Sequence, residues 1–158
     1  ATIQCDFNLP VRFDLSFTNE NGEKERPVVI HRAISGSIER FMGVMIEHFA
    51  GAFPTWLAPV QVLIIPIAEA HQEFAHTFAD SLRKNNIRVQ IDDRNESLGK
   101  RIREAEVQKI PYMLVVGDKE MQAESVAVRS FRSKKQEVMK TDVFKELLLQ
   151  ETIERKLS

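Results

Sequence analysis

The stretch "VQVLIIPI", residues 60–67, decides the fold of the larger part of this chain. It is an apolar run of strand length, and two similar runs follow it, "IRVQI" at residues 87–91 and "YMLVVG" at residues 112–117. Short runs that are rich in β-branched residues predict buried strands. Further along, "SVAVRSF" at residues 125–131 adds another predicted strand, and Thr141 is placed to cap a last helix.

Helical periodicity fills the two gaps between the first three strands. In the first gap an apolar stripe ends near Asn85 and Asn86, and its members are His71, Phe74, Ala75, Phe78 and Leu82. In the second gap Ser97 is placed as the N-cap of a helix that runs to Lys109. This alternation of strands and helices favours parallel strands, right-handed crossovers and a small open sheet with helices on its faces.

The first residues follow a different pattern. "TIQCDFNL", residues 2–9, alternates strictly, so that Cys5 falls on an apolar face that we expect to be core. A second strand is predicted over Pro27–His31, and a helix follows Gly36 with Ser37 as its N-cap. That helix carries one apolar stripe: Ile38, Phe41, Met42, Met45 and Phe49.

A proline-bracketed segment separates the two patterns. In "FPTWLAP" two prolines flank Trp56 and break regular structure, which is typical of a linker. We therefore divide the chain into a partial α+β piece at residues 1–53, a linker at residues 54–59 and a complete α/β domain at residues 60–158.

Composition excludes several classes of function. The chain carries 22 Lys and Arg against 23 Asp and Glu, so it is not a generally basic nucleic-acid binder, although cations gather between residues 83 and 109. Its single cysteine, Cys5, cannot form an internal disulfide, and no apolar run is long enough to span a membrane. No glycine-rich phosphate loop follows Ile67, which argues against a Rossmann or P-loop nucleotide site. The single cysteine and the absence of a membrane-spanning run indicate a cytoplasmic protein.

Two residues in the first piece have both a structural and a functional interpretation. His31 has no Cys or His at local ligand spacing, so the residues alone favour a hydrogen-bonded structural role over a metal ligand. Arg40 lies in the first turn of a helix, where the partial charge is positive. It could pair with Glu39 or Glu47, or it could join the free backbone N–H groups in binding a phosphate. The residues alone leave these two interpretations of Arg40 equal.

The loop and helix "DDRNESLGKRIREAE", residues 92–106, lie where open parallel sheets bind ligands. The helix is predicted to turn three apolar residues inward: Leu98, Ile102 and Ala105. Lys100 and Arg103 then face solvent. Either this face is solvated, with ion pairs to Glu104 and Glu106, or it is a polar platform for unpaired bases.

Several motifs together resemble one family. "IHRAISGSIERFMGVMIEHFAG", residues 30–51, is similar to the third signature motif of class II aminoacyl-tRNA synthetases, a glycine turn into a helix with an acidic residue next to an arginine. With "TIQCDFNLPVRFDL", "FPTWLAPVQV", "VQIDDRNESLGKRIREAEVQKIPYMLVVGDKE" and "VAVR", the chain from Ala1 to about Arg129 resembles the C-terminal part of bacterial-type threonyl-tRNA synthetases. This resemblance implies an anticodon-binding domain with a mixed five-stranded sheet flanked by helices, preceded by part of an antiparallel catalytic domain.

The resemblance also implies roles for residues of the first piece. Arg40 would be the motif arginine that contacts ATP and stabilises charge during adenylate formation. His31 would be one of three Zn²⁺ ligands, which reverses the structural interpretation above, and the zinc would hold the amino group and hydroxyl of threonine. Thr2 and Gln4 would line the pocket for ATP and threonyl-adenylate, with Ser37 near the same ligand.

In the second domain the resemblance implies contacts with the tRNA anticodon from Asn95, Arg103, Glu120 and Arg129, and weaker candidates at Lys100 and Lys119. The segment "SFRSKKQEVMKTD", residues 130–142, departs from the family because it is richer in lysine and poorer in glycine.

The implied function is that of a threonine–tRNA ligase fragment that uses ATP with Mg²⁺, threonine and threonine tRNA, and that is a homodimer in the full-length enzyme. The other class II motifs and the remaining zinc ligands are expected upstream of Ala1, so this chain alone should not aminoacylate. A stand-alone, non-catalytic RNA-binding module and an unrelated small-molecule-binding α/β domain are the alternatives.

Overall fold

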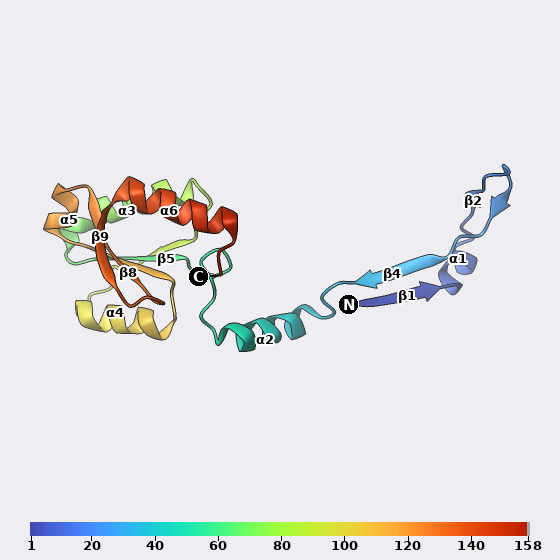
Figure 1. The fold of residues 1–158 in the computed structure, drawn as a ribbon, viewed down its shortest axis with the longest axis horizontal. Coiled ribbons are helices and arrows are strands. Elements are labelled where there is room, and N and C mark those ends of the chain that lie inside the picture. Colours follow the sequence, from blue (N-terminus) through green and yellow to red (C-terminus); the bar gives the residue numbers. More distant parts are fainter. Residues whose placement is uncertain (158) are drawn as a thin grey trace. The chain divides into compact units, whose positions relative to one another are not determined.

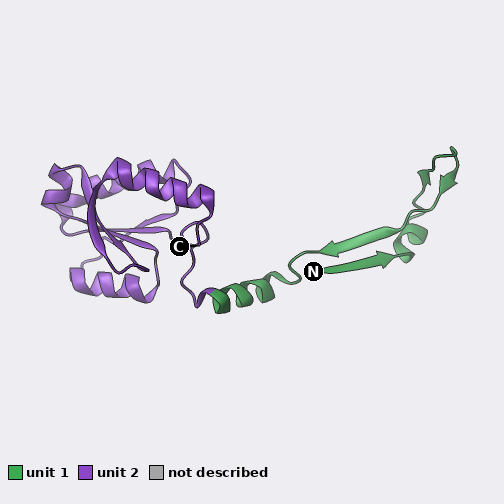
Figure 2. Ribbon diagram, in the orientation of Figure 1, with its two compact units in different colours: residues 1–48 green, residues 49–158 purple. Residues whose placement is uncertain are grey.

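A computed structural model describes residues 1–157, which separate into two compact units (Figure 2). The first unit comprises residues 1–48 and the second begins at Phe49. The first unit contains β1 (Thr2–Asp6), α1 (Asn8–Arg12), β2 (Phe17–Thr18), β3 (Lys24–Glu25), β4 (Val29–Ala33) and nearly all of α2 (Ile38–Phe49).

The second unit is built on one mixed sheet with the strand order β6-β5-β7-β8-β9 (Figure 1). Its strands are β5 (Val62–Pro66), β6 (Val89–Ile91), β7 (Tyr112–Val116), β8 (Ser125–Ser130) and β9 (Gln136–Lys140). The first three are parallel to one another, and β8 and β9 are antiparallel additions. The predicted five-stranded mixed sheet is therefore confirmed.

Helices cover both faces of this sheet (Figure 1). One face carries α3 (Gln72–Arg83) and α6 (Thr141–Glu154), and the other carries α4 (Leu98–Val107). The short 3₁₀ turn η1 (Glu69–His71) and the short helix α5 (Asp118–Gln122) follow β5 and β7. The predicted cap at Ser97 is confirmed, because its side chain accepts a hydrogen bond from the backbone of Lys100. The predicted cap at Thr141 is wrong by one position, since Lys140 is the N-cap and the Thr141 hydroxyl donates to the Glu124 carbonyl.

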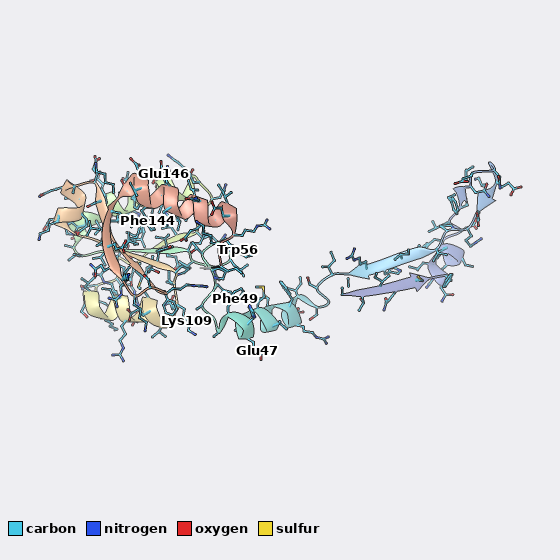
Figure 3. All side chains as sticks on the ribbon, viewed as in Figure 1. Glu47, Phe49, Trp56, Lys109, Phe144 and Glu146 are labelled. Carbon is cyan, nitrogen blue, oxygen red and sulfur yellow. The ribbon has the colours of Figure 1, made fainter. Side chains whose placement is uncertain are left out.

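The buried strand β5 divides the hydrophobic core into two clusters. Val62 and Ile64 pack among residues of α3 and α6, whereas Leu63 and Ile65 pack among residues of α4. All five residues of β5 are buried, as the apolar run predicts. In the first cluster the ring of Phe144, on α6, is fully buried (Figure 3). The sheet thus has a helix layer on each face and leaves its strand ends for loops.

The segment that leads into β5 is packed against the rest of the second unit. Glu151 on α6 accepts hydrogen bonds from the Thr55 hydroxyl at 3.0 Å and from the Tyr112 hydroxyl at 2.8 Å. Burial and the negative charge of Glu151 raise the pKa of Tyr112 above its usual range. Arg88 donates to the backbone carbonyl of Trp56 at 2.8 Å, and Trp56 lies near the end of α6 (Figure 3). This segment is therefore held by Glu151 of α6 and by Arg88, the residue before β6.

The first unit is an antiparallel ladder of β1 and β4 with a small β2–β3 hairpin. The strand predicted from Thr2 stops at Asp6, because the Asp6 carboxylate accepts hydrogen bonds from the backbone of Asn8 and Leu9 and begins α1. The predicted end of α2 is confirmed, since Gly51 follows it with a φ of 75°.

The apolar faces of the first unit lie on its surface. Cys5 is exposed, so the expectation that it is core is wrong for this unit taken by itself. Within the stripe of α2, Ile38 is 71% exposed and Phe41 is 46% exposed. Of the residues of this unit, only Pro10 is buried among those that the structure describes. Alternation predicts which side chains share a face, and it does not say what covers that face.

Candidate nucleic-acid interface

The candidate site of the second unit lies at the carboxyl edge of the parallel strands β5 and β6. The loop after β6 carries Asn95, which is exposed. Asn95 lines a polar pocket of about 370 Å³, which we call the Asn95 pocket; its other residues include Pro66, Ile67, Glu69, Gln72, Arg94 and Arg101. Open parallel sheets bind ligands at this edge. Amide, guanidinium and carboxylate groups therefore surround one hollow without a single dominant charge.

A network of ion pairs holds the loop that carries Asn95. The guanidinium of Arg94 donates to both carboxylate oxygens of Asp92, at 2.8 and 2.7 Å, and contacts Glu104 of α4 at 2.7 Å. The hydrogen bonds from Arg94 hold the pKa of Asp92 below its usual range, although burial acts in the opposite direction. Arg94 is thus engaged within the protein.

The Asp92 carboxylate should make the stability of the second unit depend on acid pH. The pKa of Asp92 is lower in the folded chain than in the unfolded chain, so its stabilising contribution is complete above the unfolded value of about 3.9 and is lost as the pH falls toward the folded value. We expect Asp92→Asn to remove part of this acid loss, measured as the free energy of unfolding in urea at several pH values between about 2 and 6. Asp93→Asn is the control, and equal pH dependence in wild type and Asp92→Asn would contradict the assignment.

Helix α4 presents a polar face, as its periodicity predicts. Ala105 is buried in the cluster beneath the helix, and Leu98 and Ile102 pack against that cluster. Arg103 is exposed, and it forms no ion pair within residues 1–157. Lys100 pairs with Glu96 at 2.6 Å. The guanidinium of Arg103 is therefore available to a ligand, whereas Lys100 is engaged.

Arg129 of β8 also lies on the α4 side of the sheet. Its neighbour Val128 points into the cluster on the opposite face, so Arg129 points toward α4, where it contacts Glu106 at 2.5 Å. Arg103 lies one helical turn before Glu106. The structure therefore places Arg103 and Arg129 next to the same stretch of helix.

Glu120 lies in α5, at the same edge of the sheet as the Asn95 pocket. Pro66 of β5 is paired with Val116 of β7, so the segments that follow these two strands leave the sheet together. The Glu120 carboxylate accepts a hydrogen bond from the backbone of Gly117 at 3.1 Å. The four sequence-predicted residues thus occupy two separate places: Asn95 and Glu120 lie at the carboxyl ends of the strands, and Arg103 and Arg129 lie beside α4, with Arg129 paired with Met113 near the start of β7.

Sequence reasoning missed the buried arginine of this region. Arg101 is only 5% exposed and donates to the backbone carbonyls of Pro66 and Asp92, at 2.9 Å each. Its spacing of three residues from Leu98 and four from Ala105 puts it on the inward face of α4. The spacing predicts that Arg101 is buried, whereas its positive charge is typical of an exposed residue.

In the first unit the structure brings Gln4 and His31 together. They are opposite partners in the β1–β4 ladder, and Thr2 lies on the same face of β1. The His31 imidazole is 3.1 Å from a carboxylate oxygen of Asp6. Backbone hydrogen bonds from Leu9, together with the contact to His31, hold the pKa of Asp6 below its usual range.

One imidazole does not form a zinc site. Structural and catalytic zinc sites use at least three protein ligands, and residues 1–157 contain no group of three His, Cys, Asp or Glu side chains that could hold a metal ion. The donor type of His31 suits Zn²⁺, but the described residues supply too few ligands to bind it.

Ser37 and Arg40 meet at the start of α2. The Ser37 hydroxyl accepts a hydrogen bond from the backbone of Arg40 at 3.1 Å, which confirms the predicted N-cap. The guanidinium of Arg40 forms no ion pair among the described residues, so the predicted alternative of a pair with Glu39 or Glu47 is not realised. This leaves Arg40 as a cation without an ion pair in the first turn of a helix whose N-terminus is capped by Ser37.

No helix within residues 1–157 combines the length and the hydropathy needed to cross a bilayer.

Two family models match the chain, one in each unit. The model described as "Anticodon binding domain" matches residues 61–151, and the model described as "tRNA synthetase class II core domain (G, H, P, S and T)" matches residues 1–49. The anticodon-binding model therefore covers more than half of the chain.

Curated relatives and a solved structure agree with these matches. Threonine–tRNA ligase of Caldanaerobacter subterraneus subsp. tengcongensis is 52% identical over 96% of this chain and 23% of its own length, and that of Sulfurihydrogenibium sp. is 56% identical over 91% and 22%. The chain thus spans less than a quarter of these relatives. The crystal structure of the RNA binding domain of threonyl-tRNA synthetase from Cryptosporidium parvum is 35% identical, with a TM-score of 0.80 over 94% of this chain and 38% of that one. The chain belongs to the anticodon-binding domain family and carries, in its first 49 residues, part of a class II tRNA synthetase core.

Proposed function

We propose that this chain is part of a threonine–tRNA ligase, an aminoacyl-tRNA synthetase that activates threonine with ATP and transfers it to threonine tRNA. The observation that carries the proposal is that similarity to curated threonine–tRNA ligases runs through both units, over 96% of the chain in one case. In this proposal residues 1–53 belong to the catalytic domain, residues 54–59 are the linker and residues 60–158 bind the anticodon.

The second unit would read the anticodon with the four polar residues that surround α4 and the strand ends. An amide offers a donor and an acceptor, guanidinium groups donate, and a carboxylate accepts, which together suit base edges. Proteins recognise RNA sequence chiefly on unpaired bases such as those of an anticodon loop. The anticodon contacts in this proposal are Asn95, Arg103, Glu120 and Arg129.

The first unit would contribute half of the activation site. Arg40 and the N-terminus of α2, capped by Ser37, would bind phosphate oxygens of ATP, which is used with Mg²⁺. Thr2 and Gln4 would line the adenylate pocket from the face of β1 that also carries His31.

His31 would supply one imidazole ligand to Zn²⁺, with the other ligands contributed from outside the described residues. The bound zinc would hold the amino group and the hydroxyl of threonine. We also propose, from the resemblance to synthetases, that the complete ligase is a cytoplasmic homodimer.

The anticodon assignment predicts the effect of removing Arg103. Because a base-reading arginine is worth about 1–3 kcal/mol, we expect Arg103→Ala to weaken binding of threonine tRNA by roughly 5- to 150-fold. The measurement is filter binding at a fixed moderate salt concentration, with a tRNA of another anticodon as the reference.

Arg83→Ala is the matched control, since Arg83 is a half-exposed arginine on α3, which covers the opposite face of the sheet. We expect this variant to bind like the wild type. If the chain showed no preference for threonine tRNA and Arg103→Ala changed nothing, the second unit would not be an anticodon reader.

A further inference from the structure

A buried guanidinium lies beneath the loop that carries Asn95. Arg101 is only 5% exposed, and its Nη1 atom donates to the carbonyl oxygens of Pro66 and Asp92, each at 2.9 Å. Its Nε atom is buried without a hydrogen-bond partner among the described residues. The two bonds of Nη1 therefore orient the whole guanidinium.

One of these carbonyls belongs to a residue that lines the Asn95 pocket, Pro66, and the other belongs to Asp92, whose neighbour Asp93 lines the pocket from the loop. Pro66 is the last residue of β5, and Asp92 directly follows β6 and begins the loop to Asn95. Both groups lie at the end of the parallel ladder, and a buried carbonyl without a donor costs about 1–3 kcal/mol. Arg101 supplies that donor from α4, so one side chain joins the helix, the end of β5 and the base of the loop.

Burial separates Arg101 from the cations that a polynucleotide could touch. Arg103, two residues later on the same helix, is exposed, whereas the Arg101 side chain has almost no surface for a phosphate. Two other contacts hold the loop: the Asp92 backbone N–H donates to the Ile64 carbonyl of β5 at 2.9 Å, and the half-exposed Arg94 joins the loop to Glu104 of α4. Arg101 is thus the buried side chain that supports the loop, and its guanidinium donates to backbone carbonyls.

We infer that Arg101 is a positioning residue for base discrimination: by joining Pro66 and Asp92 it fixes the separation of the pocket walls and hence the place of Asn95. The inference rests on the proposed function, because it supposes that Asn95 reads a base. A hydrogen-bonding group discriminates between bases only when it is held in place, so a loosened loop should still bind RNA but lose selectivity.

The test is a double-mutant cycle on the full chain, using RNA hairpins that carry the threonine anticodon loop with each of the four bases in turn at each anticodon position. We expect Asn95→Ala to lower discrimination at one position, and Arg101→Met to lower it at least tenfold at that same position. The double variant should be no worse than Asn95→Ala alone, because both changes remove one function. Arg101→Lys, which keeps donors for the two carbonyls, should restore discrimination.

Two readouts distinguish positioning from other roles. The slope of log affinity against log salt should stay at the wild-type value in Arg101→Met, whereas loss of a phosphate contact would reduce it by about 0.7. Circular dichroism fixes a temperature at which each variant is folded. If Arg101→Met does not fold, Arg101→Gln is tested instead. The shorter side chain of Gln can donate to only one of the two carbonyls, so we expect an intermediate loss of base discrimination.

The outcomes are distinct. Full discrimination in folded Arg101→Met or Arg101→Gln, additive effects in the double variant, or a reduced salt slope would overturn the inference while leaving the proposed function intact. If Asn95→Ala itself changed discrimination at no position, the reading role of Asn95 and with it the basis of the inference would be lost.

Discussion

Replacing Arg40 by alanine in a complete ligase that carries this sequence is expected to slow ATP–pyrophosphate exchange by roughly 10²- to 10³-fold while leaving tRNA affinity unchanged. The reason is the placement of the charge: the guanidinium stands in the first turn of α2, at the positive end of the helix dipole, and it forms no ion pair with a carboxylate among the described residues. Preorganised donors of this kind contribute about 2.7–4 kcal/mol when charge develops in a transition state.

Arg32→Ala is the matched control for this experiment. Arg32 is an exposed arginine of β4, and its neighbour His31 points to the other face of the ladder. We expect that variant to exchange pyrophosphate at the wild-type rate. Equal rates for Arg40→Ala and wild type would exclude Arg40 from the activation site, and equal losses for both arginines would indicate a general effect of charge.

Replacing Phe144 by alanine is expected to lower the free energy of unfolding of the second unit by about 3–5 kcal/mol. The Phe144 ring is fully buried in the cluster between the sheet and helices α3 and α6, and it meets the ring of Tyr112 edge-on at a centroid distance of 5.5 Å. The substitution would leave a cavity and remove this aromatic pair. Urea unfolding followed by the fluorescence of Trp56, the single tryptophan of the chain, reports on this unit alone.

Val143→Ala provides the comparison, because Val143 is the preceding residue of the same helix and is 53% exposed. We expect it to change the unfolding free energy by less than about 0.5 kcal/mol. A loss of under 1 kcal/mol in Phe144→Ala would mean that the core repacks around the missing ring, which would contradict the close packing of Phe144 described above.

Hydrophobic periodicity predicts most of the second unit. The run that becomes β5 is buried on both faces, and such runs can be read from residue type alone. Strand β9 could not be predicted in this way, because "QEVMK" contains only two apolar residues. An edge strand pairs on one side and needs few apolar residues, so its sequence carries little signal.

The candidate site was only partly predictable, and Arg101 shows why. Its spacing places it on the inward face of α4, yet a charged residue at such a position ordinarily breaks the hydrophobic pattern of a helix. Its burial is stable because two backbone carbonyls at the ends of β5 and β6 need a donor, and they meet only in the folded chain. Exposed residues such as Arg103 are simpler, since periodicity alone places them on the solvent side.

The first unit shows the opposite limit. The sequence correctly predicts a strand through Gln4, a second strand that includes His31 and the helix cap at Ser37, whereas the pairing of the two strands comes from the structure. The burial of Cys5 does not follow, because a face becomes core only when another layer covers it.

The carboxylate of Glu151 has a consequence for protein engineering. Anyone wishing to transplant the anticodon-binding module onto another scaffold would be tempted to cut at Val60, next to the first strand. That cut would delete Thr55, whose hydroxyl is one of the two that donate to Glu151, and it would expose Tyr112 to solvent. The transplant should instead start no later than Phe49, so that the segment before β5 travels with the helix that holds it.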